Sequence, residues 1–188
     1  MYKPKFPNLY SDNRISLIDL LREGKAPAEI IDDVLGLVDD TDYFEAPAST
    51  KYHGAEPGGL FTHSKNVTEL LVNWTRMGLI VWEHSWSPYV VGPLHDFTKV
   101  GKYRLNPSLE GFQYTDRALA GYGGHGSDSL CKVAIKVLLS EEEAMCIRYH
   151  MGAYEKDNWK GFDEAIQKYP NVLWTHHADM VASKLVEV

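Results

Sequence analysis

A histidine and an aspartate stand side by side in the segment "GPLHDFTKVGKY" at positions 92–103. The pair, His95 and Asp96, follows the apolar run Tyr89–Val91, and Lys99 comes three residues later. Imidazole nitrogen and carboxylate oxygen together suit Zn²⁺, Mn²⁺, Fe²⁺, Ni²⁺ or Co²⁺ better than Ca²⁺, which takes oxygen ligands alone. Both side chains can reach one ion where the backbone turns at the end of a helix. The segment therefore predicts part of a metal site.

Further histidines and a second aspartate occur where helices would face or enter the core. Each of them alone would most often be a structural residue rather than a ligand. Buried polar groups without partners are costly, however, and a shared metal centre would satisfy all of them together. The pattern thus favours one metal centre, and the candidate residues beside the His-Asp pair are His63, His125, His150, His176 and Asp179.

Helices must position these residues, and the apolar spacing along the chain is mostly helical. It predicts helices within residues 15–21, 30–38, 60–77, 87–96, 127–139 and 171–186. Ser140, followed by Glu143, has the pattern of a capping box and predicts the start of a further helix. Residues 102–116 lack a helical pattern and predict a short β-hairpin or an ordered loop. We expect a mainly α-helical protein with one domain over residues 1–188.

The composition is that of an ordinary globular protein. The chain has 188 residues, of which 44% are hydrophobic and 24% charged, and its net charge is −7. This charge argues against a protein that coats nucleic acid through a basic face. The N-terminus lacks a signal-peptide core and no run approaches a membrane span, so we expect a cytoplasmic protein without a membrane partner. In that reducing setting we expect Cys131 and Cys146 to be buried free thiols.

Competing motifs lack the context that they need. The "GYGGHG" segment fits the spacing of a dinucleotide-binding loop, but no apolar strand precedes it. The chain contains no H-E-x-x-H motif, and neither cysteine belongs to a C-x-x-C pair, which argues against a zincin or a zinc deaminase.

In their order and context, five segments resemble the HD-domain superfamily of metal-dependent phosphohydrolases: "GGLFTHSKNV", "LHDFTKVGKY", "GHGSDSL", "IRYHMG" and "HHADMVAS". The likeness spans about residues 50–185 and extends to small bacterial and phage hydrolases and to the HD part of a 3′→5′ exoribonuclease. It implies a helical bundle of the HD type. By position, it implies that a first metal ion is held by His63, His95, Asp96 and Asp179. His125 and His150 resemble the further histidines of members with two ions, where Asp96 would bridge.

The resemblance also implies roles beyond the metal ligands. A metal-activated water would attack phosphorus, and Lys99 would stabilise charge on the phosphoryl group; the alternative is that Lys99 is a solvated surface lysine. His176, one turn before Asp179, is a candidate to orient a ligand or to contact the substrate. Three more residues are candidate substrate contacts: Lys51, His53 and Arg148.

We therefore expect an enzyme that hydrolyses a phosphoester of a nucleotide or of a nucleotide-derived substrate, with one or two divalent transition-metal ions. Two alternatives remain open. One is a 3′→5′ exonuclease that acts on short oligonucleotides, and the other is a non-catalytic HD scaffold that binds or senses a nucleotide. The complete set of ligand residues favours the enzyme, and the acidic net charge favours a small nucleotide over long nucleic acid.

Overall fold

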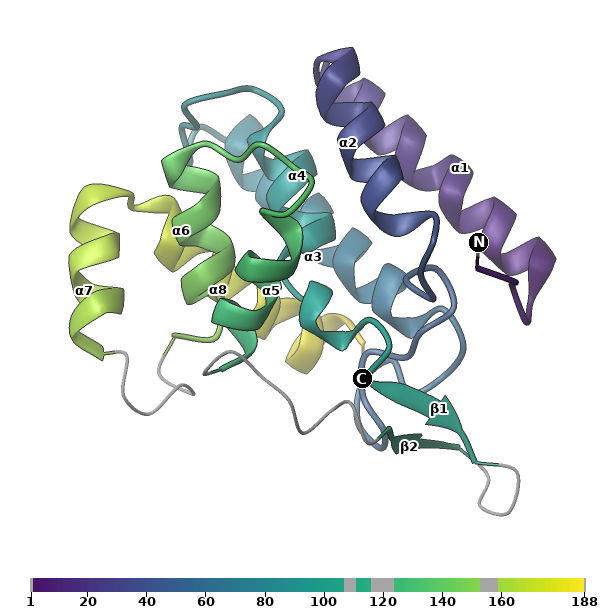
Figure 1. Ribbon diagram of the computed structural model, residues 1–188. Helices are drawn as coiled ribbons and strands as arrows, with labels where there is room; N and C mark the ends of the chain where they lie inside the picture. Colours follow the sequence, from purple (N-terminus) through teal and green to yellow (C-terminus); the bar gives the residue numbers. More distant parts are fainter. Residues whose placement is uncertain (1, 107–110, 116–123, 153–158, 188) are drawn as a thin grey trace.

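The computed structural model describes residues 2–106, 111–115, 124–152 and 159–187, and this part of the chain is mainly helical (Figure 1). Its α-helices are α1 (Pro7–Glu23), α2 (Ala28–Val38), α3 (Gly59–Arg76), α4 (Ser87–Leu94), α5 (His125–Val133), α6 (Glu141–Tyr149), α7 (Trp159–Lys168) and α8 (Asn171–Val181). A 3-10 helix, η1 (Phe97–Lys99), follows α4, and a π-helical turn, η4 (Ala182–Val186), follows α8. The predicted mainly α-helical fold is confirmed.

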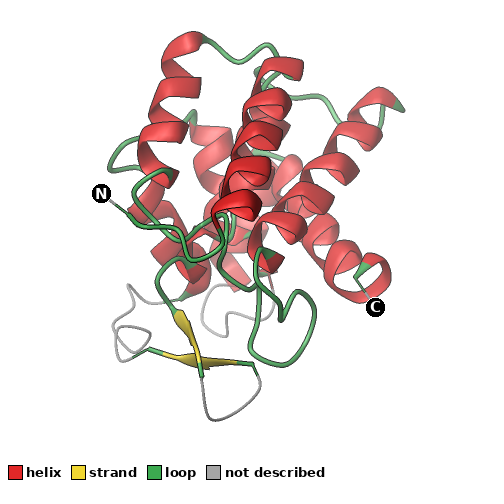
Figure 2. Cartoon of the chain, turned by 90° about the vertical axis from the view of Figure 1, so that its right-hand side faces the viewer, coloured by secondary structure: helices red, strands yellow, loops and turns green. Residues whose placement is uncertain are grey.

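The predicted short hairpin is also present. Strands β1 (Tyr103–Leu105) and β2 (Phe112–Tyr114) pair antiparallel, with Tyr103 opposite Tyr114. The two strands lie beyond one end of the helices (Figure 2). The hairpin begins four residues after Lys99, so it extends directly from the segment that carries the His-Asp pair.

The core lies around α3, which packs against α4 and α8, while α6 packs against α5 and α8. Helices α1 and α2 lie side by side at one edge and α7 lies at the opposite edge (Figure 1). Most of these helices contribute residues to one apolar core cluster. Its members include Leu17, Val34, Leu71, Val91, Ile147 and Val172. None of the helices in the described ranges combines the length and the apolar character needed to cross a bilayer.

Two glycines allow the helices that carry the candidate ligands to approach closely. A Cβ atom on Gly92 of α4 would lie 2.2 Å from the hydroxyl of Thr68 on α3. A Cβ atom on Gly126 of α5 would lie 1.8 Å from the carbonyl oxygen of Arg148 on α6. Any larger residue at either position would push the two helices apart. These contacts therefore set the spacing between the segments that hold the candidate histidines.

The capping box predicted at the start of α6 is confirmed. The Ser140 hydroxyl accepts a hydrogen bond from the backbone N–H of Glu143, and the Glu143 carboxylate accepts one from the backbone N–H of Ser140. Such a reciprocal pair satisfies two backbone donors that the helix itself leaves free. The Glu143 carboxylate also accepts a hydrogen bond from the Ser87 hydroxyl, at 2.8 Å, which ties the start of α6 to the start of α4.

Three details differ from the expectations. The helix predicted over residues 127–139 begins earlier, at His125, and ends at Val133, where tight turns replace it; β-branched residues at 133, 135 and 137 disfavour its continuation. Helix α7 was not predicted, although Trp159, Phe162 and Ala165 have helical spacing. Cys131 is exposed rather than buried, because α5 turns Ser129 and Val133 inward instead; Cys146 is buried as expected.

Candidate metal centre

Five of the predicted metal ligands meet in the interior, and we call them the central cluster: His63, His95, Asp96, His150 and Asp179. They come from α3, from the junction of α4 and η1, from the end of α6 and from α8. The three imidazoles are fully buried. The ring centroids of His63 and His95 lie 5.3 Å apart, and those of His95 and His150 lie 5.0 Å apart. One ligand atom from each of His63, His95 and Asp179 lies within 4.8 Å of the other two.

Hydrogen bonds orient all three imidazoles in the same way. His95 and His150 each donate from Nδ1 to the backbone carbonyl three residues earlier, at 2.7 Å. His63 donates from Nδ1 to the carboxylate of Glu187, at 3.0 Å. In a neutral ring with the proton on Nδ1, Nε2 carries a lone pair. Among the described residues, none of the three Nε2 atoms has a hydrogen-bond partner. Histidines that ligate metals are usually oriented by such a bond from the other ring nitrogen.

The two carboxylates lie at distances that suit ligands of a shared ion. His63 Nε2 is 3.1 Å from Asp179 Oδ1, yet the two atoms are not aligned as a hydrogen bond. His150 Nε2 is 3.9 Å from Asp96 Oδ1, which is itself buried and without a hydrogen-bond partner in the described structure. Two ligands bonded to one tetrahedral zinc lie about 3.3 Å apart, given bonds of about 2.0 Å. The His63–Asp179 distance is close to this value, and the His150–Asp96 distance is longer than it.

The electrostatics favour the protonation states of metal ligands at three of these positions. Burial, with a contribution from His150, lowers the pKa of His95 to about 4, so this imidazole is neutral at pH 7. Burial alone would raise the pKa of Asp96, but Lys99 and the neighbouring histidines outweigh it and hold that pKa well below its usual range. Asp179 is likewise held ionised, since its close contact with His63 and the nearby imidazoles outweigh the effect of burial on its pKa.

His63 differs from His95 because two carboxylates flank its ring. Burial lowers the pKa of His63, but Asp179 and Glu187 outweigh this effect and raise it to about 9. In the absence of an ion the ring therefore holds a second proton at pH 7. Coordination through Nε2 releases that proton, as metal binding to a protonated ligand generally does.

Lys99 lies against the cluster rather than on the surface. Its side chain is buried and its ammonium forms an ion pair with Asp96 Oδ2. The alternative of a solvated surface lysine does not fit this position. A buried cation next to the proposed bridging carboxylate is placed where charge on a bound phosphoryl group would need compensation.

His125 is brought near the cluster but engages another partner. It is the first residue of α5, it is half-buried, and its Nε2 lies 3.1 Å from the ammonium of Lys102. Burial lowers the pKa of His125, and burial also lowers the pKa of Lys102. Lys102 was not among the predicted site residues, although it follows Lys99 by three residues.

A buried network holds the segment that carries Asp96 and Lys99. The Asp128 carboxylate accepts a hydrogen bond from the Thr98 hydroxyl at 2.5 Å and pairs with Lys132 at 2.8 Å. The Ser129 hydroxyl accepts the backbone N–H of Thr98 at 3.0 Å. Helix α5 therefore fixes η1 through two consecutive side chains. This role escaped the sequence analysis, because an isolated Ser-Asp-Ser run is also typical of an exposed helix start.

The predicted substrate contacts divide into two groups. His53 and His176 lie beside the central cluster: the His53 ring centroid is 5.1 Å from that of His63, and His176 donates from Nδ1 to the carbonyl of His150 at 2.8 Å. The other two are not brought to it by any described contact. Lys51 is exposed, and the guanidinium of Arg148 is bonded to Ser127 and lies over the ring of Tyr149.

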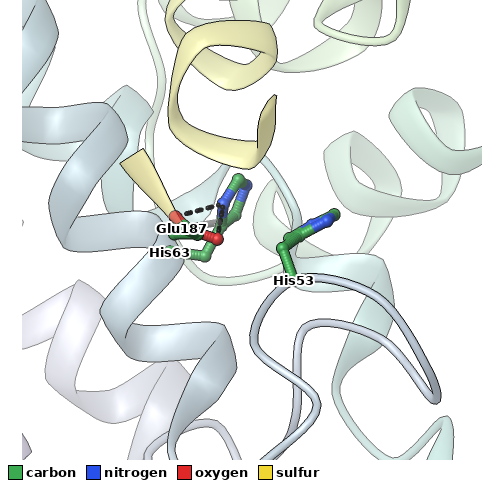
Figure 3. Close-up of side chains that lie close together, drawn as sticks. All are labelled: His53, His63 and Glu187. Carbon is green, nitrogen blue, oxygen red and sulfur yellow. Dashed lines mark hydrogen bonds and ion pairs between the residues drawn. The ribbon is translucent and has the colours of Figure 1, made fainter. Parts of the chain in front are cut away.

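Glu187 is the main residue that the sequence analysis missed. Its carboxylate approaches His63 Nδ1 with both oxygens, at 3.0 and 3.2 Å, and accepts a hydrogen bond from Asn66 at 3.0 Å (Figure 3). The signal that could have found it is its place eight residues after Asp179, about two helical turns further along. A carboxylate that orients a histidine is a common companion of a metal ligand.

Comparison of the chain with protein-family models, with curated proteins and with solved structures finds no match. The chemistry of the site is therefore inferred from its geometry. Three imidazole nitrogens and two ionised carboxylates form a donor set that fits a divalent transition metal.

Proposed function

We propose that the protein is a metal-dependent phosphohydrolase that cleaves a phosphoester of a nucleotide or of a nucleotide-derived substrate. The observation that carries this proposal is the convergence on two carboxylates of three buried Nε2 atoms, none of which has a hydrogen-bond partner within the part of the chain that the structure describes. Leaving a buried polar atom unpaired costs about 1–3 kcal/mol. Coordination of one or two ions of Mn²⁺, Fe²⁺, Zn²⁺, Ni²⁺ or Co²⁺ removes that cost, as it would in the HD-domain superfamily that the sequence resembles.

The donor set divides naturally between two ions. His63, His95 and Asp179 would hold the first ion together with Asp96, whose Oδ2 would exchange its pairing with Lys99 for that ion and leave Oδ1 to a second ion. His150 faces the free oxygen of Asp96 and would hold that second ion, with His125 if its ring turns away from Lys102. Divalent ions at such a site supply an activated water at neutral pH and polarise phosphoryl oxygens.

The chain's own residues provide the remaining functions. Lys99 and Lys102 place two ammonium groups next to the proposed ligands and would bind phosphoryl oxygens. Tyr52, in the same loop as His53, is 80% exposed and offers a ring on which a base can stack. Cations for the phosphate and an aromatic ring for the base together favour a nucleotide over a simple sugar phosphate.

The test is a substrate screen with metal-loaded protein. Purified chain is stripped of metal, reloaded with each of the five ions, and incubated with nucleotides, sugar phosphates and short oligonucleotides while released phosphate and nucleotides are measured. We expect hydrolysis of a nucleotide that disappears in Asp96→Ala and persists in His84→Ala, which replaces a half-buried histidine that stacks on Trp86 and belongs to neither group of candidate ligands. Hydrolysis by Asp96→Ala at the wild-type rate would refute the proposal.

The same screen separates the two alternatives. Stepwise release of mononucleotides from the 3′ end of an oligonucleotide, without turnover of free nucleotides, would identify an exonuclease. Tight binding of a nucleotide by the metal-loaded chain, without any hydrolysis, would identify a binding or sensor module.

A further inference from the structure

A second set of metal-binding side chains meets at the other nitrogen of the His63 ring. We call it the outer cluster: His53, His63 and Glu187 (Figure 3). One ligand atom from each residue lies within 4.8 Å of the other two. His53 lies in the loop before α3, and Glu187 is the residue directly after η4. The two clusters share only His63.

The outer cluster has the spacing and the access of a cation site. His63 Nδ1 lies 3.0 and 3.2 Å from the two oxygens of Glu187, close to the roughly 3.3 Å between two ligands of one tetrahedral zinc. Asn66 donates to Glu187 Oε1, which orients the carboxylate, while Oε2 has His63 Nδ1 as its neighbour at 3.2 Å. His53 and Glu187 are only half-buried, so an ion can reach them from solvent, whereas the histidines of the central cluster are fully buried.

A neutral imidazole cannot serve both clusters at once. A neutral ring has one N–H group and one lone pair. When Nε2 ligates an ion in the central cluster, Nδ1 carries the proton and donates to Glu187. When Nδ1 ligates an ion in the outer cluster, Nε2 must carry the proton, and Asp179 Oδ1 lies 3.1 Å from it. Each tautomer therefore has a carboxylate close to its protonated nitrogen, and the Nε2–H form needs only a small turn of the ring or carboxylate to align the bond.

We propose that the outer cluster is a second, inhibitory site for a zinc-like divalent ion, and that its occupation withdraws His63 from the central cluster. Two imidazoles and one carboxylate suit Zn²⁺, Co²⁺ or Ni²⁺, whereas Mg²⁺ and Ca²⁺ prefer oxygen ligands and do not compete. The outer site stands on its own geometry; the inhibition rests on the proposed metal-dependent function of the central cluster.

The tautomer of His63 is the direct readout. Long-range ¹H–¹⁵N correlation spectra of the histidine rings distinguish a proton on Nδ1 from a proton on Nε2, and they are recorded while Zn²⁺ is added to the full chain. With the first equivalents of Zn²⁺ we expect His63 to keep its proton on Nδ1. With excess Zn²⁺ we expect the proton to appear on Nε2, and excess Mg²⁺ should leave the spectrum unchanged.

Two variants connect this change to the outer cluster. His53→Ala removes one ligand and should raise the Zn²⁺ concentration for half-conversion at least about tenfold, since even residues behind the ligands contribute that much to metal affinity. Glu187→Gln retains an oxygen that accepts the Nδ1 proton but loses the charged ligand, so its His63 should stay in the Nδ1–H form. The control His84→Ala should convert as wild type does.

The outcome is decisive in either direction. A His63 ring that keeps its proton on Nδ1 at every Zn²⁺ concentration would overturn the proposal, and so would variants of the outer cluster that convert at the wild-type concentration. This readout does not depend on hydrolysis. A spectral change in a chain that hydrolyses no phosphoester would support the outer site and refute the proposed activity, whereas hydrolysis without the spectral change would do the reverse.

Discussion

Metal binding should stabilise the folded chain, because an ion would satisfy buried polar atoms that otherwise lack partners. Substitution of His150 tests this explanation most directly. The buried Nε2 atoms of His95 and His150 and the buried Oδ1 of Asp96 have no hydrogen-bond partner in the described structure. At about 1–3 kcal/mol each, these three atoms cost the metal-free fold about 3–9 kcal/mol. At a free ion concentration of 100 times Kd, linkage gives about 2.7 kcal/mol of stabilisation. For a chain of this length that free energy raises Tm by about 5–11 °C.

His150→Gln removes one proposed ligand from a position that is fully buried in the wild type. A loss of about 10–100-fold in metal affinity leaves about 0.4–1.4 kcal/mol of stabilisation at the same ion concentration. We therefore expect the Tm shift of the variant to be about half of the wild-type shift or less. Differential scanning calorimetry of metal-free and metal-loaded protein measures both shifts, and His84→Gln is the matched control that should keep the full shift.

Two results would refute this reasoning. The first is a wild-type chain whose Tm does not rise with any of the five ions at millimolar concentration. The second is a His150→Gln protein with a metal-induced shift as large as that of the wild type. The first result would mean that the buried atoms are satisfied in some other way, and the second that His150 is a structural residue.

Three further predictions concern single side chains. Asp96→Ala should abolish phosphoester hydrolysis, whereas Lys99→Ala should retain bound metal by elemental analysis and slow turnover about 10²–10³-fold in steady-state assays; unchanged kinetics would exclude a role for this lysine. Asp128→Ala should lower the free energy of unfolding in urea by about 1–3 kcal/mol, because a buried hydroxyl on η1 loses its acceptor. A change below about 0.5 kcal/mol, which is the scale of surface substitutions, would contradict that. Cys131 should react with a thiol reagent in the folded chain and Cys146 should not, because burial hides its thiol and raises its pKa; mass spectrometry of the labelled protein counts the modified thiols.

Much of the architecture could be predicted, because helices show a periodic apolar spacing and capping motifs that can be recognised in a short segment of sequence. Apolar spacing located most of α3 and α4, and the Ser140–Glu143 pair marked the start of α6. The same spacing predicted that the His63 side chain faces the core, and in the structure this side chain is buried. The end of α5 and the existence of α7 were harder to predict, because propensity along a short segment is weak compared with the packing of its neighbours.

The sequence by itself determined which residue types could form a metal site, since five separate segments each place a ligand at a helix face or a helix end. Only the tertiary structure decided which of them meet. It joined His63, His95, Asp96, His150 and Asp179, turned His125 toward Lys102, and buried Lys99 beside Asp96. It also brought Glu187 to His63 across 124 positions of the chain. Such contacts depend on the angles and separations of packed helices, which the close approaches at Gly92 and Gly126 set and which no local pattern encodes.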